Sequence, residues 1–213
     1  MSVKKNIAAK INGILNINKP PDLTSQDVVS FVKHLSKQRH VGHAGTLDPI
    51  ATGVLPICLS QATRMSSYLM ECSKAYLAEI TLGISTNSYD REGTVVERKD
   101  PSYVTKTQIA ELLPTFTGKI MQKPPSFSAL KYRGKRLYEL ARSGIEVKTV
   151  AREVNIYRLE LLDWIPPRLI VEVECSKGTY IRSIAHDIGQ SLGCGAHISA
   201  LKRIKYGPFN IEN

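Results

Sequence analysis

The sequence predicts an α+β fold in which a largely antiparallel, mixed sheet is flanked by helices. Segments with strand-like and helix-like spacing of apolar residues mix along the 213 residues without a strict strand–helix–strand repeat, which argues against a parallel doubly wound sheet. No internal repeat, low-complexity tract or linker-like stretch divides the chain. We therefore expect one compact domain over residues 1–213, with residues 1–10 as a basic N-terminal extension.

The first expected elements are a strand, a turn and a helix. The short run Gly13–Asn18 has strand character and ends at two prolines, and Thr24 or Ser25 can then cap a helix whose apolar residues recur at helical spacing. From residue 37 to residue 52 the periodicity vanishes, and glycines and a proline mark a long loop. Such a loop is more often functional than idle, so we look for chemistry there first.

The later elements follow from the same spacing rules and from glycines or prolines at their ends. They are expected strands over Val54–Leu59, Ala75–Leu82, Arg152–Leu162 and Leu169–Cys175, a short helix over Ala62–Met70, a helix over Thr105–Phe116 with its C-terminal cap at Gly118, and a helix over Thr179–Leu192 that ends at Gly193.

Composition favours a polyanionic partner. Twenty-nine Lys and Arg against nineteen Asp and Glu give a formal charge of +10 and a pI near 9.5, so nucleic acid is favoured over an acidic membrane surface. A basic, solvated surface without a partner is the alternative. The longest apolar runs are too short for a membrane span, and the four cysteines lack zinc or disulfide spacing. We expect reduced thiols and a cytoplasmic protein.

One segment combines basic and aromatic residues. After Pro124 and Pro125, the cations Lys131, Arg133 and Lys135 alternate with tyrosines, a pattern that suits a phosphate backbone with unstacked bases nearby. Composition alone favours an ordinary solvated turn equally well.

The loop Gly42-His43-Ala44-Gly45-Thr46-Leu47-Asp48-Pro49 holds the densest cluster of special residues. Its glycines allow close backbone approach, and Pro49 biases Asp48 toward an extended conformation that presents the carboxylate. Taken alone, Asp48 would more often be a turn residue than a catalyst. Gly42 to Gly45 also fits the G-x-x-G clamp of KH domains, although Pro49 blocks the helix expected after it.

This loop resembles the signature of the TruB family of tRNA pseudouridine synthases. The resemblance extends from about Ile11 to Arg203, because further motifs match in order. These motifs are Gly13 through Lys19-Pro20 with Thr24-Ser25, Ala51–Pro56, Lys74–Tyr76, Ser128–Lys131, Cys175–Arg182 and Leu192–His197.

The chain departs from the family pattern in three places. Asp22 stands where the family usually has Gly, and Thr86-Asn87-Ser88 replaces Thr-Asp-Thr ahead of Asp90 and Gly93. These two changes put turn geometry or substrate contacts in doubt, not the reaction. Bacterial members also usually continue into a C-terminal PUA-type RNA-binding region, which we expect to be absent from a chain that stops at Asn213. Weaker or less discriminating tRNA binding would follow.

The resemblance implies a pseudouridine-synthase-like catalytic domain that converts uridine 55 in the TΨC arm of tRNA to pseudouridine. The base is detached from the ribose, turned and rejoined through C5, so no cofactor and no metal is expected. Asp48 would be the nucleophile, attacking either the ribose C1′ or the base. Arg182 would pair with this carboxylate, and Tyr76 would stack on the uracil and act as general base.

The resemblance also implies residues that bind the substrate. The target uridine must be flipped out of its arm, and His43 would fill the vacated stacking place. Tyr180 and Leu201 would line the pocket and exclude water, while Lys19 and Pro20 would support the loop. Lys131, Arg133 and Lys135 are candidates for phosphate contacts. We expect the TΨC stem-loop of tRNA as partner, and a monomeric enzyme.

Two alternatives keep the RNA but not the reaction. A KH-type RNA-binding module would explain the charge and the G-x-x-G, but leaves Asp48, Tyr76 and Arg182 unexplained. A tRNA chaperone would bind and fold tRNA without modifying it. A carboxylate-based nucleotidase or glycosidase would need a second acid near Asp48, and the loop offers none.

Overall fold

The computed structural model describes residues 11–145, 147 and 149–212, so the basic extension expected at residues 1–10 lies outside the described residues. The fold is α+β with a large, mostly antiparallel sheet, as the sequence predicts. Contacts divide the chain into two compact units: residues 1–74 with 202–213 form the first unit, and residues 75–201 form the second. A single catalytic domain over residues 1–213 stays a prediction.

The first unit is built on strand β3 (Thr52–Leu59). Strand β1 (Gly13–Lys19) pairs antiparallel with it from Gly13 opposite Leu59 to Lys19 opposite Gly53, and the short β2 (Val41–His43) also pairs antiparallel with it. The C-terminal part of β12 (Ala196–Tyr206) pairs with β3 in parallel. Strand β2 interrupts the segment predicted to be one long loop, because its residues extend the ladder of β3.

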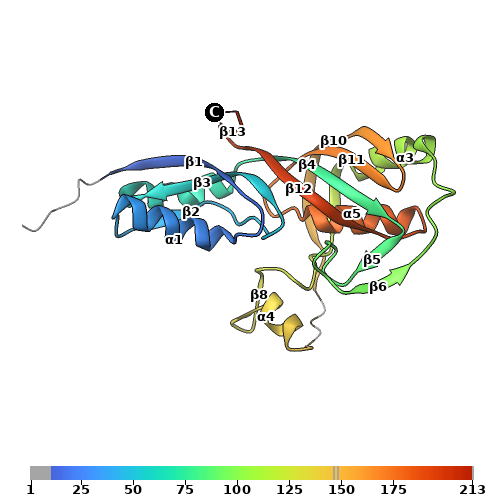
Figure 1. The fold of residues 1–213 in the computed structure, drawn as a ribbon, viewed down its shortest axis with the longest axis horizontal. Helices are drawn as coiled ribbons and strands as arrows, with labels where there is room; N and C mark the ends of the chain where they lie inside the picture. The colour runs from blue at the N-terminus through green and yellow to red at the C-terminus, as the bar shows by residue number, and fades with distance from the viewer. Residues whose placement is uncertain (1–10, 146, 148, 213) are drawn as a thin grey trace, which may run out of the picture. The chain divides into compact units, whose positions relative to one another are not determined.

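Helix α1 (Ser25–Ser36) runs along the strands of the first unit (Figure 1). It begins as predicted, with a capping box in which Thr24 and Asp27 satisfy each other's backbone N–H groups, and it buries Val28, Val29 and Val32. The helix predicted over Ala62–Met70 is instead a 3-10 helix η1 (Ser60–Met65) followed by α2 (Ser66–Met70). The hydroxyls of Thr63 and Ser66 donate to nearby backbone carbonyls, which favours the tighter turns.

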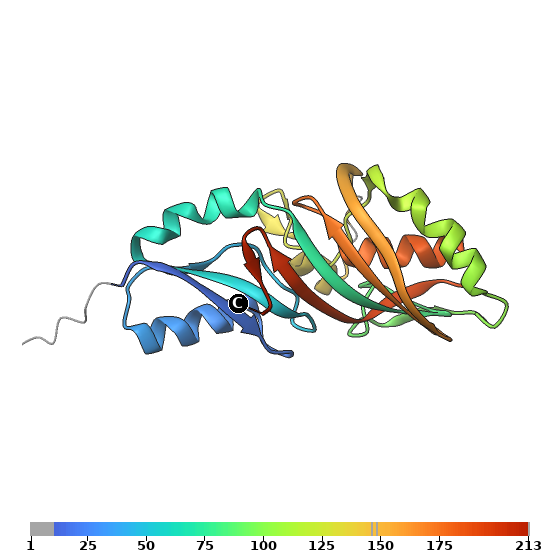
Figure 2. The same cartoon turned by 90° about the horizontal axis from the view of Figure 1, so that it is seen from above.

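The second unit contains the N-terminal part of β12 and the strands that follow it in the sheet order, which are β4 (Lys74–Leu82), β11 (Arg168–Cys175), β10 (Arg152–Ile165) and β7 (Gly118–Gln122). Strand β10 pairs antiparallel with both β11 and β7. Helix α5 (Ile181–Ser191) packs its apolar face against these strands (Figure 2), because Ile181, Ile184 and Ile188 are buried. Helix α5 carries Arg182 in its first turn.

Smaller elements complete the fold. Strands β5 (Ile84–Thr86) and β6 (Val95–Arg98) form one hairpin, β8 (Lys131–Tyr132) and β9 (Lys135–Arg136) form another ahead of α4 (Leu137–Arg142), and β13 (Phe209–Asn210) pairs with β12.

The helix predicted over Thr105–Phe116 is split in two. Thr105 caps α3 (Lys106–Leu112), and a 3-10 helix η2 (Leu113–Phe116) follows. Pro114 lacks the N–H that an α-helix needs in its interior. Gly118 is therefore not the predicted cap but the first residue of β7, with a φ of 90°.

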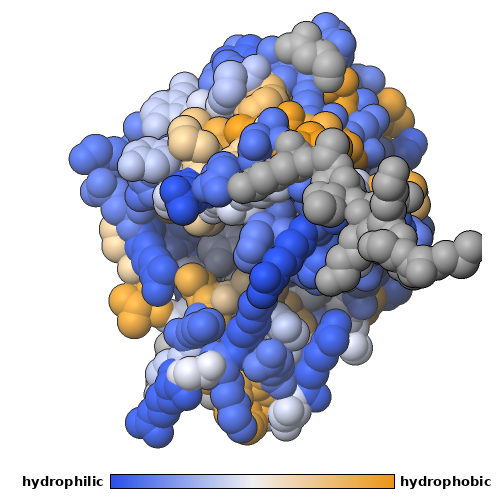
Figure 3. All heavy atoms as spheres, turned by 90° about the vertical axis from the view of Figure 1, so that its left-hand side faces the viewer, coloured by the Kyte–Doolittle hydropathy of each residue, from blue (hydrophilic) through white to orange (hydrophobic). Residues whose placement is uncertain are grey.

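One face of the molecule is largely polar. Figure 3 shows one face on which hydrophilic side chains cover most of the visible surface and hydrophobic ones form smaller groups. No helix among the described residues combines the length and apolarity needed to cross a membrane. All four cysteines are free, and within the described ranges no group of three or more His, Cys, Asp and Glu could hold a metal ion.

Candidate functional site

The loop that carries Asp48 is held by its backbone at nearly every residue. The N–H of Ala44 donates to the Pro56 carbonyl at 3.0 Å, and the N–H of Ala51 donates to the Asp48 carbonyl at 3.0 Å. Ser25, at the start of α1, binds Leu47 twice: its hydroxyl accepts from the Leu47 N–H at 2.9 Å and donates to the Leu47 carbonyl at 3.2 Å. The loop therefore presents Asp48 from a fixed backbone.

Lys19 supports the loop just after the carboxylate. Its side chain is fully buried, and its ammonium donates to the carbonyls of Pro20, Leu23 and Pro49 at 2.8, 2.6 and 3.1 Å. Burial lowers the pKa of this ammonium, while the charges of Asp22 and Asp48 raise it. These contacts agree with the supporting role that the resemblance implies for Lys19.

The departure at Asp22 has a geometric explanation. Asp22 has a φ of 64°, in the left-handed region that favours glycine, and its N–H donates to the Pro49 carbonyl at 3.0 Å. Asp tolerates this conformation better than most non-glycine residues. The departure therefore keeps the turn that anchors Pro49 and adds a negative charge near Lys19.

His43 ends strand β2, beside the same loop. Burial, and then the charge of Arg203, lower the pKa of its imidazole below the usual 6.5. Its Nδ1 has no hydrogen-bond partner among the described residues. The lowered pKa favours the neutral form of the ring, which suits stacking on a base better than pairing with an anion. Because the Gly42–Gly45 pattern lies in a strand and loop, it does not resemble a clamp between two helices.

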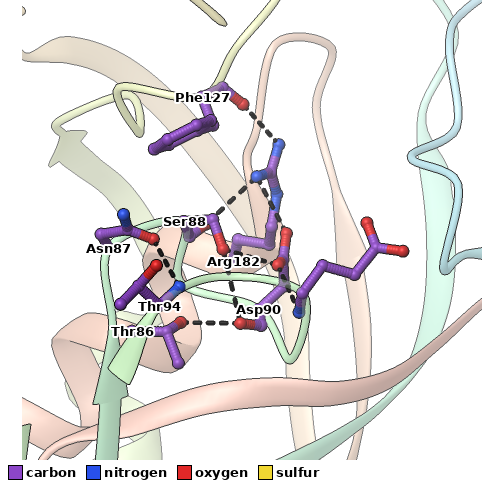
Figure 4. Close-up of polar contacts among 8 residues, drawn as sticks. Thr86, Asn87, Ser88, Asp90, Thr94, Phe127 and Arg182 are labelled. Carbon is purple, nitrogen blue, oxygen red and sulfur yellow. Dashed lines mark hydrogen bonds and ion pairs between the residues drawn. The ribbon is translucent and has the colours of Figure 1, made fainter. Parts of the chain in front are cut away.

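In the second unit, Arg182 is the centre of a buried polar cluster (Figure 4). Although it lies in the first turn of α5, where an isolated Arg is usually at the surface, only 6% of it is exposed. One guanidinium nitrogen donates to Asp90 Oδ2 and to the Ser88 carbonyl, both at 3.1 Å, and the other donates to the Phe127 carbonyl at 3.0 Å. Asp90 compensates the buried charge.

Asp90 is a residue to which the sequence reasoning assigned no role. Its Oδ1 accepts from the Ser88 hydroxyl at 2.6 Å and from the Glu92 N–H at 3.1 Å, so both carboxylate oxygens are bonded. The sequence signal that could have indicated its role is its position as an acidic residue just after Thr86-Asn87-Ser88, where the chain departs from the family pattern. The departures themselves take part in the turn, because Ser88 orients Asp90 and the Asn87 side chain accepts from the Thr94 N–H at 3.0 Å.

The remaining candidates of the second unit lie on strands and at the helix start. Tyr76 on β4 and Leu201 on β12 are 8% and 7% exposed. Tyr180 precedes α5 and is fixed by the Gln122 side chain, which accepts from its N–H at 2.8 Å and donates to its carbonyl at 2.9 Å. The pairing of Arg182 with Asp48 would join residues of different units and stays a prediction, as do the other implied roles.

The basic and aromatic segment forms an exposed hairpin. Lys131 pairs with Arg136 and Tyr132 pairs with Lys135, so Arg133 and Gly134 form a two-residue turn with φ angles of 49° and 86°. The Arg133 guanidinium lies 5.4 Å from the centre of the Tyr132 ring. This arrangement presents cations and an aromatic ring to solvent, as a phosphate-binding surface requires.

Comparison with known proteins gives consistent matches over the whole chain. Residues 33–181 match the family model described as TruB family pseudouridylate synthase (N terminal domain), and residues 182–213 match that of the tRNA pseudouridylate synthase B C-terminal domain. The tRNA pseudouridine synthase B of Dehalococcoides mccartyi is 53% identical over 203 residues, which are 95% of this chain and 68% of the relative. That of Francisella philomiragia is 47% identical over 211 residues, 99% of this chain and 70% of the relative.

Solved structures show the same fold. A chain of a Cbf5-Nop10-Gar1 complex superposes with a TM-score of 0.73 at 33% identity, and covers 94% of this chain. A chain of an H/ACA RNP bound to a substrate RNA containing 2'-deoxyuridine superposes with a TM-score of 0.69 at 31% identity, and covers 93% of this chain. This chain spans about half the length of both, 50% and 48% respectively.

Proposed function

Because the chain belongs to the TruB family of pseudouridylate synthases, we propose that it isomerises uridine 55 in the TΨC arm of tRNA to pseudouridine, with Asp48 as the nucleophile. The observation that carries this proposal is the loop of residues 42–49, which holds one carboxylate between backbone groups anchored by Ser25 and Lys19. The curated relatives are tRNA pseudouridine synthases B, which are isomerases acting on the same class of RNA.

The reaction needs a nucleophile and a protected intermediate, and no external group. The glycosidic bond between uracil N1 and ribose C1′ breaks, the base turns, and a bond forms between C5 and C1′ while C5 loses its proton to N1 or solvent. The Asp48 carboxylate attacks either C1′ or the base, and is released when the new bond has formed. Water must be kept from the detached base, which favours a pocket with apolar walls.

We propose that Arg182 and Tyr76 act with Asp48. A guanidinium near the nucleophile keeps its carboxylate ionised and oriented. The buried position of Arg182, and its bonds to Asp90 and to two carbonyls, support this role because they fix the guanidinium plane. Tyr76 is nearly buried on β4 and offers a ring for stacking and an oxygen to take the C5 proton.

We propose that the remaining candidates bind and reshape the RNA. A uridine inside a folded arm must be flipped out, at a cost of a few kcal/mol. His43, with its neutral ring, would take the vacated stacking place, and Tyr180 and Leu201 would wall the pocket. The exposed hairpin with Lys131 and Arg133 would contact phosphates.

The test follows tritium release from uridine C5 in an unmodified tRNA transcript. Wild type should release tritium, while Asp48→Asn should release none and keep its tRNA affinity within about threefold, because the nucleophile acts mainly in the transition state. The exposed Asp163→Asn removes a carboxylate elsewhere in the chain and should leave release unchanged. A transcript with cytidine at position 55 should release no tritium if the reaction is specific for that uridine.

Other outcomes separate the rival functions. Release by Asp48→Asn at the wild-type rate would remove the nucleophile assignment. Tight tRNA binding with no release by wild type would instead support a chaperone or a non-catalytic RNA-binding protein.

A further inference from the structure

Arg203, on strand β12, is almost completely buried, with 1% of its surface exposed. Its guanidinium donates from Nε to the Val54 carbonyl at 2.7 Å, from Nη1 to the Thr46 carbonyl at 3.4 Å and from Nη2 to the Gly45 carbonyl at 3.2 Å. Because the donors of a guanidinium lie in one rigid plane, these acceptors are held in a fixed relation to strand β3 and to each other.

The backbone around Arg203 cannot easily shift. Arg203 pairs in parallel with Gly53, and a Cβ added at Gly53 would lie 2.1 Å from the Arg203 carbonyl oxygen. Gly53 also has a φ of 100°, which only glycine adopts readily. The close approach of β12 to β3 therefore fixes the position of the Arg203 backbone, from which its side chain extends.

Tyr206, three residues further along β12, also packs against the loop. Its ring is fully buried and lies 4.8 Å from the Arg203 guanidinium, and the Lys74 ammonium lies 4.7 Å from the ring centre. A Cβ added at Gly45 would approach the Tyr206 ring to 2.9 Å. Gly45 thus rests directly on this ring while its carbonyl binds Arg203.

The anchors fall on both sides of the carboxylate. Arg203 holds the carbonyls of Gly45 and Thr46 ahead of Asp48, and Lys19 holds the carbonyl of Pro49 directly after it. Two buried cations therefore fix the backbone that presents Asp48. Both side chains donate hydrogen bonds to backbone carbonyls, so their role is geometric as well as electrostatic.

We infer that Arg203 is a positioning residue for the reaction: it sets the orientation of the Asp48 carboxylate through the carbonyls of Gly45 and Thr46. The expected effect on the reaction rests on the proposed function, whereas the anchoring of the loop by Arg203 does not. Misplacing a reacting group by about 1 Å can cost roughly 100-fold in rate, so loss of these bonds should lower kcat and leave KM nearly unchanged.

The experiment compares Arg203→Met and Arg203→Lys with Lys202→Met, which removes one positive charge from the exposed neighbouring position. Circular dichroism identifies a temperature at which every variant is folded, and the rates are compared at that temperature. Single-turnover tritium release should fall about 10- to 100-fold for Arg203→Met and less for Arg203→Lys. The affinity for tRNA should stay within about threefold, and Lys202→Met should keep the wild-type rate constant.

Hydrogen exchange gives a second readout that does not depend on activity. The loop amides of Ala44, Leu47 and Ala51 donate to the Pro56 carbonyl, the Ser25 hydroxyl and the Asp48 carbonyl respectively. They should exchange about tenfold faster in both Arg203 variants and at the wild-type rate in Lys202→Met. If wild type releases no tritium, the proposed function fails. Hydrogen exchange then still tests whether Arg203 anchors the loop.

Two results would overturn the inference. Exchange at the wild-type rate in a folded Arg203→Met would show that Arg203 does not hold the loop. Faster exchange with an unchanged kcat would show that the anchored geometry does not matter for the chemistry. If Arg203→Met does not fold, Arg203→Lys decides, because it keeps the charge but its compact ammonium lacks the planar fork whose separate nitrogens reach Gly45, Thr46 and Val54.

Discussion

Some cationic side chains of this protein are buried, although Lys and Arg usually lie at the surface. Lys19, Arg182 and Arg203 are each less than 7% exposed, yet each has several hydrogen-bond acceptors around its charged group. A buried cation without such partners would cost several kcal/mol. Around these three cations, carbonyls or a carboxylate therefore replace the water that burial removes.

A carboxyl group on α5 shows the effect of partial burial on an acid. Asp187 is half-buried, and burial raises the pKa of its carboxyl to about 6 from an ordinary 3.8. Nearby, Tyr89 stacks on His186 with ring centres 3.9 Å apart, and burial lowers the pKa of the His186 imidazole. Neither neighbour offers Asp187 a fixed positive charge.

Asp187→Asn should change how stability depends on pH. Because the pKa of Asp187 is higher in the folded state than in the unfolded state, its contribution is fully present below pH 4 and is lost as pH rises through about 6. Wild type should therefore lose stability relative to Asp187→Asn between pH 4 and pH 7, by about 1 kcal/mol after allowance for solvent screening. Urea unfolding at several pH values measures this difference.

Asp187→Ala is the control, because it also lacks the carboxyl. Its free energy of unfolding should follow the same pH profile as that of Asp187→Asn, whatever its absolute value. A constant difference between wild type and Asp187→Asn across the range would contradict the assignment.

At the scale of elements, the close crossing of β12 and β3 positions the loop. The parallel pairing at Lys202 and Arg203 brings the end of β12 to the loop that follows β2, where Arg203 binds the carbonyls of Gly45 and Thr46. The core of the first unit lies at the same place, since Ala44 of the loop packs with Val54, Leu69 and Tyr206. A change in this crossing should therefore affect both stability and the loop.

Gly53→Ala should be strongly destabilising. The added Cβ would lie 2.1 Å from the Arg203 carbonyl oxygen, and the positive φ disfavours any side chain. Overpacking and the left-handed backbone together should cost about 3 kcal/mol of the free energy of unfolding. Urea unfolding would measure the loss. Tritium release should also slow, because Arg203 moves with its strand.

Gly13→Ala on β1 is the matched control, since a Cβ there meets nothing within 4 Å. It should change stability by less than about 0.5 kcal/mol. If both substitutions had the same small effect, the strands would have room to separate and the crossing would not fix the loop.

At the scale of the whole molecule, the formal charge of +10 should set how RNA binding depends on salt. The hairpin at Lys131–Arg136 concentrates exposed cations beside two tyrosines. Each cation that contacts a phosphate adds about one to the slope of log affinity against log salt concentration. Binding by this chain should therefore weaken steeply as salt is raised.

Lys131→Glu tests whether the hairpin contributes to that dependence. It should weaken tRNA binding and reduce the slope by about one, as measured by titration of labelled tRNA at several salt concentrations. Lys106→Glu, which makes the same charge change on the exposed start of α3, should leave the slope nearly unchanged. Equal slopes for the two variants would remove Lys131 from the RNA surface.

Patterns within short segments predicted much of the fold and part of the site. The capping box at Thr24, the helix before and the strand after the 37–52 segment, and the glycine-rich loop with Asp48 all follow from neighbouring residues. The resemblance of ordered motifs to the TruB family added the class of enzyme. Local patterns suffice here because caps, strand alternation and tight turns depend on residues a few positions apart.

Contacts between distant residues were decided only by the tertiary structure. The Arg203 guanidinium binds a carbonyl 158 positions earlier in the chain, and Arg182 binds Asp90 from 92 positions away. No spacing rule links such residues, because packing of the strands chooses their partners. The sequence by itself determined which residue types were available to this protein, and the fold decided which buried cation holds which part of the site.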